Sequence, residues 1–534
     1  MAEPESTGCF ALVLHCHLPY VRHPEHEDFL EESWLYEAVA ETYVPLLLVM
    51  ERLLHEGIPF RFALSLSPTL CEMLSDELLQ ERCRRYLRRQ VELAEREVRR
   101  KRGTAFEPAA RMYLDHFSRV REAYAGRYRS RLLRAFSRLE ERGNVELIGS
   151  AATHALFPLL STPQGRAAQV EAGLQNFSKH FGHGPDGFWL PECAYEPGLE
   201  DLLARCGMRY FILDTHGILL GDPRPAFGVF RPLETPSGCF AFGRDVESSR
   251  QVWSADEGFP GDALYREFYR DLGYDAPLDY VGPYLHTEGE RRYLGFKYHR
   301  VTGDVPLDRK EPYEPDAAFR LAERHAKSFV QQRAAQAVRV RQAVHVMPVI
   351  VAPYDAELFG HWWFEGPAFL EAVFRELARC PELTCVTPGE FLRTHAEEAD
   401  GRQAGRPAPS SWGYRGYFET WVNGSNDWMY PRLHRAESRL VEAVTRASGD
   451  GLRRRALDQA ARELMLAQGS DWAFLVSTDT AREYATRRFG QLTDRCETLI
   501  RAAETGGVDP HYLTLCEAME DAFPELDCMV FGRR

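Results

Sequence analysis

The amino-acid sequence predicts an α/β fold built on a barrel of parallel strands, with helical segments attached to it. Short apolar runs that end in a polar turn alternate with helical segments, as they do in βαβ units. A long, charge-rich helical stretch interrupts this alternation at about residues 71–142. Mostly amphipathic helix follows a polar connection at 396–411. With 534 residues, the chain is long enough for more than one domain.

The N-terminal part predicts the first βαβ unit. Residues 9–21, CFALVLHCHLPYV, form an apolar run that leads into a polar turn, which is the pattern of a first barrel strand. Residues 31–57 have helical spacing and end at Gly57, and FRFALSLSPTL at 60–70 predicts a second strand.

Residues 71–142 carry mixed charges at i, i+4 spacing, which predicts an exposed helical insertion. The basic run at 84–102 could suggest RNA binding. Interspersed Glu residues and a chain net charge of −14 favour a solvated helix face instead. Further strand-like runs then follow along the chain, at 145–160, 187–193, 208–217, 238–245 and 346–355.

The polar Gly/Pro/Ser segment 396–411 is the predicted domain boundary. It separates a catalytic barrel at 1–395 from a helical C-terminal domain at 412–534, whose first residues are rich in tryptophan. We expect these tryptophans to reach the active-site cleft.

The composition excludes several classes of function. Negative net charge argues against a nucleic-acid partner and against an anionic membrane surface. The sequence contains no uncharged apolar stretch of about 18 residues and no N-terminal secretory pattern. Its 12 cysteines are scattered without a C-x-x-C pair. We therefore expect a reduced cytoplasmic protein without a zinc knuckle or a disulfide framework.

Two carboxylates follow apolar runs and precede aromatic clusters. Glu192 lies in GFWLPECAYEP (187–197), and Asp355 in VMPVIVAPYDAELFGHWWFEG (346–366). Chemistry in parallel barrels gathers at the C-terminal ends of the strands, and paired carboxylates ringed by aromatic side chains are typical of glycosidases. Either acid alone could instead cap a helix N-terminus.

Three histidines follow strand-like runs as well. His15 and His17 are two residues apart, so their side chains share one face of a strand, and His154 follows another run. Such residues can bind a metal, or they can donate hydrogen bonds to sugar hydroxyls and hold a carboxylate in place.

Motifs spread over residues 9–490 resemble glycoside hydrolase family 57, and within it the 1,4-α-glucan branching enzymes. The motifs are LHCHLPYV, IGSAATHALFPLL, GFWLPECAYEP, QVWSADEGFPGD, APYDAELFGHWWFEG, SWG with ETWVN, and GSDWAFLVST. The resemblance implies a (β/α)7 barrel with a helical insertion and a helical C-terminal domain. It also implies cleavage of an α-1,4-glucan with retention of configuration, transfer of the cleaved chain to a 6-hydroxyl, and no metal or other cofactor.

The resemblance assigns roles to individual residues. It implies that Glu192 is the nucleophile and that Asp355 is the acid/base. Residues matching glucan-binding positions of the family, or predicted as sugar platforms, are His15, His17, His154, Arg244, Gly261, Trp412, Trp421, Asp471, Trp34 and Trp363.

The chain departs from the family pattern in two places. An insertion found in archaeal members after the CAYEPG motif is missing. The loop at 219–233 contains phenylalanines and no tyrosine, whereas a family tyrosine on this loop is thought to favour transfer over hydrolysis.

Three alternatives remain open. The same two acids could serve an α-amylase or a 4-α-glucanotransferase. A metal-dependent carbohydrate deacetylase would use His15 and His17 as ligands together with a neighbouring aspartate, and the motif CHLPY offers none. A glucan-binding scaffold without activity would not need both acids.

Overall fold

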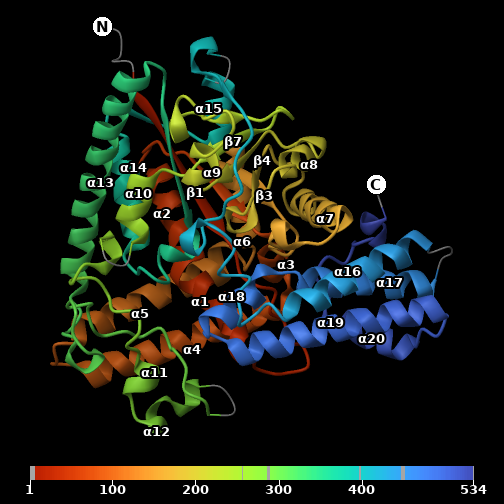
Figure 1. Cartoon of the computed structure of the whole chain (residues 1–534). Helices are drawn as coiled ribbons and strands as arrows, with labels where there is room; N and C mark the ends of the chain where they lie inside the picture. Colours follow the sequence, from red (N-terminus) through yellow and green to blue (C-terminus); the bar gives the residue numbers. More distant parts are fainter. Residues whose placement is uncertain (1–5, 255–256, 286–288, 396–397, 447–450, 533–534) are drawn as a thin grey trace.

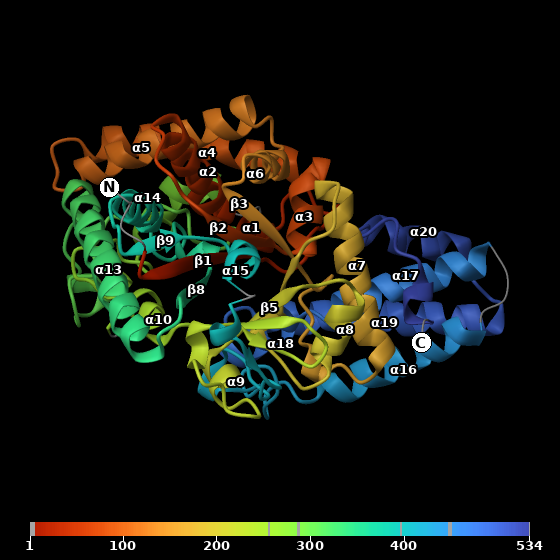
Figure 2. The same ribbon diagram turned by 90° about the horizontal axis from the view of Figure 1, so that it is seen from above.

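The computed structural model describes residues 6–254, 257–285, 289–395, 398–446 and 451–532. Seven parallel strands form a curled sheet at its centre (Figures 1 and 2). In spatial order they are β8 (Val349–Asp355), β1 (Gly8–Cys16), β2 (Phe62–Leu66), β3 (Val145–Ser150), β4 (Gly187–Trp189), β5 (Tyr210–Leu213) and β7 (Phe240–Gly243). Just past β7, the N–H of Asp245 donates to the carbonyl of Val351 in β8 at 2.8 Å, which joins the two edges. The predicted barrel fold is confirmed.

The strands are shorter than the apolar runs that predict them. All nine residues of β1 are buried, as expected for a parallel strand covered on both faces. The run at 145–160 is a strand only as far as Ser150, and the run at 208–217 only from Tyr210 to Leu213. Most of the remaining apolar residues of these runs are also buried, although they lie outside the strands, so burial alone does not distinguish them from strand residues.

Helices cover the outside of the sheet. In the barrel part the helices are α1 (Ser33–Ala38), α2 (Val44–His55), α3 (Pro68–Ser75), α7 (Pro163–Phe181), α8 (Leu199–Arg205), α9 (Thr215–Leu219), α10 (Val246–Trp253), α11 (Leu272–Asp275), α12 (Leu278–Val281), α13 (Pro315–Val344), α14 (Gly366–Leu377) and α15 (Pro388–His395). Of these, α11 and α12 project away from the sheet at the lower left of Figure 1. Three short strands extend the sheet, namely β6 (Leu233–Glu234), β9 (Leu383–Cys385) and β10 (Gln403–Ala404).

The predicted insertion is helical. It contains α4 (Glu77–Lys101), α5 (Glu107–Arg121) and α6 (Leu132–Glu141), and Figure 1 shows α4 and α5 side by side along the lower left edge. Several arginines of the basic run bind acidic side chains. Arg84 pairs with Glu81 at 2.8 Å, and Arg100 pairs with Glu97 at 2.6 Å. These contacts agree with a helix face that carries mixed charge.

The C-terminal region is helical, as predicted, and lies to one side of the barrel in both ribbon views (Figures 1 and 2). It contains α16 (Met429–Arg446), α17 (Leu452–Ala467), α18 (Ser470–Thr478), α19 (Arg482–Thr505) and α20 (Pro510–Met519). A buried ion-pair network connects these helices, in which Arg495 contacts both Glu463 and Glu520. None of the helices in the described ranges is long and apolar enough to cross a membrane.

The predicted connection at 396–411 lies against the barrel over its described part. Strand β10 pairs with β6, and Ser410 exchanges backbone hydrogen bonds with Tyr195 at 2.8 and 3.1 Å. Residues 396 and 397 lie outside the described residues. The division into domains at this segment stays a prediction.

Candidate active site

A cavity of about 580 Å³ opens at the C-terminal ends of the barrel strands. Side chains of β1 and β8, and of the turns after β1, β3, β4 and β7, meet there, together with residues from the C-terminal region. Ten of the twelve predicted site residues line it, namely His15, His17, Trp34, His154, Glu192, Arg244, Asp355, Trp412, Trp421 and Asp471.

The other two predicted residues do not line this cavity. Gly261 lies in an exposed turn, Phe259–Gly261. Trp363 is buried and packs on Phe369, with ring centroids 4.8 Å apart. Its neighbour Trp362 is 44% exposed and lines the cavity instead. In the structure, therefore, Trp362 is the member of this pair that is available to a sugar.

Glu192 follows β4 in the 3₁₀ turn Pro191–Cys193 and has a φ of +59°, in the left-handed region that side chains rarely adopt. Its carboxylate accepts hydrogen bonds from Trp412 Nε1 at 2.7 Å and from Ser470 Oγ at 3.4 Å. Burial raises the pKa of Glu192 to about 7, while the bond from Trp412 favours the ionised form. A strained backbone that is held in place is typical of a functional position.

Asp355 is the last residue of β8 and stands beside His15 in the register of β8 with β1. Burial, and then the negative charges of Glu357 and Glu192, hold the pKa of Asp355 well above its usual range. Within the described residues, no hydrogen-bond donor contacts this carboxyl group as Trp412 contacts Glu192. The surroundings of the two acids therefore favour different protonation states. Hydrogen-bond donors favour the ionised form of Glu192, and neighbouring acids favour the protonated form of Asp355.

Two of the three predicted histidines, His15 and His154, belong to one hydrogen-bonded series that ends at Glu192. His15 Nδ1 lies 3.0 Å from Ser65 Oγ, and His15 Nε2 lies 3.0 Å from His154 Nε2. His154 Nδ1 in turn lies 3.0 Å from Ser470 Oγ, which contacts Glu192. Burial, together with neighbouring histidines, holds the pKa values of His15 and His154 well below the usual range, so both rings are neutral.

His17 differs from the other two histidines because Asp471 accompanies it. Its Nε2 lies 3.0 Å from Asp471 Oδ1, and its Nδ1 lies 2.9 Å from Ser67 Oγ. Burial opposes protonation of His17, but Asp471 outweighs this effect and raises its pKa. When it is protonated, His17 can donate a hydrogen bond to a ligand in the cavity or stabilise a nearby carboxylate.

The same residues are the ones that could hold a metal ion. Ligand atoms of His17, His154 and Asp471 lie within 4.8 Å of one another. Although the motif CHLPY contains no aspartate, Asp471 reaches these histidines from α18, as a metal-dependent deacetylase would require. Asp471 Oδ1 also lies 3.0 Å from His17 Nε2, so these two side chains contact each other directly.

Sequence reasoning missed a number of residues that line or support the cavity, and four of these bear directly on its chemistry. Ser470 and Glu357 lie one and two positions from predicted site residues. Trp253 stacks on Trp412 with centroids 6.2 Å apart, and Trp362 meets Trp253 edge to face. These four residues belong to the motifs QVWS, YDAE, HWW and GSDW, which the sequence shows. The sequence does not show which way their side chains point.

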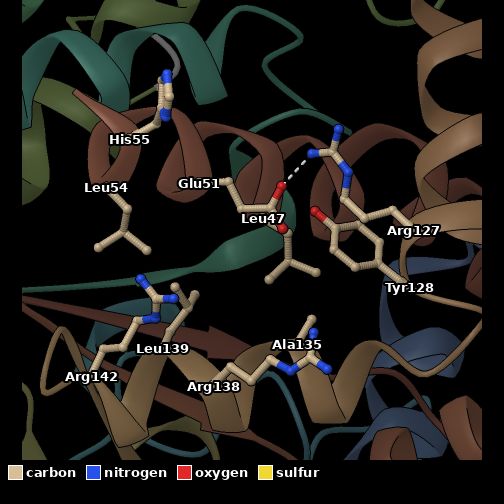
Figure 3. Close-up of a pocket in the computed structure, with 10 residues that line it drawn as sticks. All are labelled: Leu47, Glu51, Leu54, His55, Arg127, Tyr128, Ala135, Arg138, Leu139 and Arg142. Atoms are coloured by element: carbon tan, nitrogen blue, oxygen red, sulfur yellow. Dashed lines mark hydrogen bonds and ion pairs between the residues drawn. The ribbon is translucent and has the colours of Figure 1, made fainter. Parts of the chain in front are cut away.

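A second cavity, about 340 Å³ in volume, lies between α2 and α6. Figure 3 shows leucines and arginines around it and a single carboxylate, Glu51, which is paired with Arg127. It offers no pair of acids, so of these two cavities the first has the groups for acid–base chemistry.

Two family models match the chain, and each covers a different part of it. A model described as glycosyl hydrolase family 57 matches residues 11–348, and one described as 1,4-alpha-glucan branching enzyme, C-terminal, matches 432–531. A 1,4-alpha-glucan branching enzyme of Thermococcus kodakarensis is 35% identical, over 97% of this chain and 77% of the relative.

Two crystal structures resemble the whole chain. The alpha-amylase AmyC of Thermotoga maritima is 40% identical with a TM-score of 0.92, and the alignment covers 99% of both chains. A GH57-type branching enzyme of Pyrococcus horikoshii is 33% identical with a TM-score of 0.88, covering 99% of this chain and 97% of the other.

Proposed function

This chain belongs to glycosyl hydrolase family 57, and we propose that it is a 1,4-α-glucan branching enzyme. Such an enzyme cleaves an α-1,4 bond and transfers the released chain to a glucan 6-hydroxyl, which creates an α-1,6 branch. The observation that carries the proposal is the contribution of the C-terminal region to the cavity. Residues Trp412, Trp421 and Asp471 line it, and the match to a branching-enzyme C-terminal model lies in the same region, at 432–531.

In the proposed first step Glu192 attacks the anomeric carbon while Asp355 protonates the departing glycosidic oxygen. The result is a covalent glycosyl-enzyme. The hydrogen bonds to Glu192 and the acidic surroundings of Asp355 support this assignment, since a nucleophile must be ionised and a general acid must carry its proton.

In the second step Asp355 acts as a base toward the acceptor. A glucan 6-hydroxyl gives a branch, and water gives hydrolysis, so the outcome depends on how well the site holds an acceptor and excludes water. Aromatic rings around the cavity, Trp253, Trp362 and Trp412, are proposed to hold the glucan chains, whereas Trp421 is buried and supports the wall. In this proposal residues 1–395 supply the chemistry, and 412–534 complete the acceptor side beyond the connection at 396–411.

The pH dependence follows from the two acids. We expect kcat/KM to fall below about pH 7 as Glu192 takes up a proton, and to fall again at high pH as Asp355 loses its own. Trp412→Phe keeps a ring but removes the N–H that stabilises the ionised Glu192. The acid limb should then move up by roughly one pH unit, as expected from the loss of a hydrogen bond to a charged group. A pH profile of kcat/KM measures this shift, and an acid limb unchanged in Trp412→Phe would contradict it.

An α-amylase is the second candidate, favoured by the 40% identity to AmyC and by the missing tyrosine in the loop at 219–233. Product linkage separates the two. We expect amylose treated with the enzyme to gain α-1,6 bonds, detected by proton NMR and by chain-length analysis after debranching. Reducing ends without new α-1,6 bonds would instead identify an amylase, and disproportionated linear chains would identify a 4-α-glucanotransferase.

A further inference from the structure

We infer that the exposed side chains of Tyr269, Tyr274 and Tyr293 form an outer binding site for an α-1,4-glucan chain, continuous with the catalytic cavity. The inference rests on the proposed function, because it takes the same polymer as ligand. It adds a surface outside the cavity that selects for long chains.

The three tyrosines form one exposed patch. They are 65%, 50% and 37% exposed, in the order Tyr269, Tyr274 and Tyr293. The rings of Tyr274 and Tyr293 lie 5.3 Å apart, and Phe268 contacts Tyr269 at 5.3 Å and Tyr293 at 6.1 Å. The patch surrounds α11, which projects at the lower edge of Figure 1. Tyrosine offers a flat apolar face and a polar edge, and both suit a pyranose ring.

A buried lysine fixes part of this patch from beneath. Lys297 Nζ lies 4.2 Å from the ring centroid of Tyr293 and 4.7 Å from that of Phe268. It also donates a hydrogen bond to the carbonyl of Phe268 at 2.5 Å and lies 3.6 Å from Asp271. Asp271 holds Lys297 in place. The lysine in turn contacts the rings of Tyr293 and Phe268, so these two rings lose little side-chain entropy when a ligand binds.

Aromatic contacts connect the patch to the catalytic cavity. Successive ring centroids lie 5.5–6.3 Å apart along the series Phe268, His361, Trp362, Trp253 and Trp412. The last four residues line the cavity, and Trp412 donates its N–H to Glu192. A glucan chain too long for the cavity can therefore continue over aromatic surface to the tyrosines.

Binding is tested directly in a Glu192→Gln background, which prevents turnover. Tyr269→Ala/Tyr274→Ala removes the two most exposed rings and leaves Tyr293 over Lys297. We expect retardation of this protein in native gels containing amylose to weaken by roughly fivefold, as for the loss of one or two aromatic contacts. The matched control is Trp428→Ala, since Trp428 is also exposed, at 45%, and does not line the cavity.

Kinetics with active enzyme give the second measurement. For the double variant, kcat/KM on long amylose should fall several-fold relative to kcat/KM on maltoheptaose, while Tyr269→Phe/Tyr274→Phe should retain most of the wild-type ratio because it keeps the rings. Amylose binding and chain-length dependence that match those of Trp428→Ala would overturn the outer site. A wild-type enzyme without activity on any α-glucan would refute the proposed function instead, so the two failures are distinguishable.

Discussion

Replacing Glu192 with glutamine is expected to lower kcat on amylose by at least about 10⁴-fold, because no glycosyl-enzyme can form without the carboxylate. Glutamine has nearly the same shape and can still accept the bond from Trp412 Nε1, which is 2.7 Å long in the structure. The loss would therefore come from the missing nucleophile and not from a disturbed cavity. Iodine staining and NMR of the products both measure it, and undiminished branching would remove Glu192 from this role.

The control for Glu192→Gln is its stability. Folding raises the pKa of Glu192 from 4.5 to about 7, so the wild-type protein loses stability as the pH rises through this interval and the buried group ionises. Glutamine does not ionise. The thermal midpoint of Glu192→Gln at pH 8 should thus equal or exceed that of the wild type, with no such gain at pH 4. A lower midpoint at pH 8 would point to a folding defect.

Replacing Asp355 with alanine is expected to cost about 10²- to 10⁴-fold on amylose, the usual contribution of a general acid. The first step should recover with α-maltosyl fluoride, since fluoride leaves without protonation. The glycosyl-enzyme should then accumulate, because no base activates the acceptor.

Azide distinguishes the roles of the two acids. With Asp355→Ala, azide should attack the glycosyl-enzyme and give an α-glycosyl azide, the same configuration as the substrate. With Glu192→Ala, azide should occupy the place of the missing nucleophile and give the β-azide from the α-fluoride. NMR identifies the anomers, and the opposite pair of products would mean that the two roles are exchanged.

The sequence predicted the barrel well because its strands are continuous apolar runs, and residues at their C-terminal ends must meet. Glu192 and Asp355 could therefore be placed at one mouth although 163 positions separate them. The lengths of the strands could not be predicted. Residues 151–157 are all buried, as those of a strand would be, but they form turns beyond the end of β3.

The directions of side chains could not be predicted from the sequence either. In the pair Trp362 and Trp363, nothing in the sequence says which ring faces the cavity and which packs on Phe369. Ser470 could not be placed either, because its link from His154 to Glu192 depends on how α18 docks against β3 and β4. Contacts made between distant parts of a chain are set by packing, and local patterns do not encode them.

The two residues that donate hydrogen bonds to Glu192, Trp412 and Ser470, lie late in the chain. They are therefore synthesised after both acids. Both acids leave the ribosome before Trp412 and Ser470 are made, since chains emerge from the N-terminus. A nascent or truncated chain that ends before residue 412 has its nucleophile and its acid, but neither hydrogen bond that favours the ionised nucleophile. The proposed nucleophile is therefore stabilised in its ionised form only after the C-terminal region has folded against the barrel.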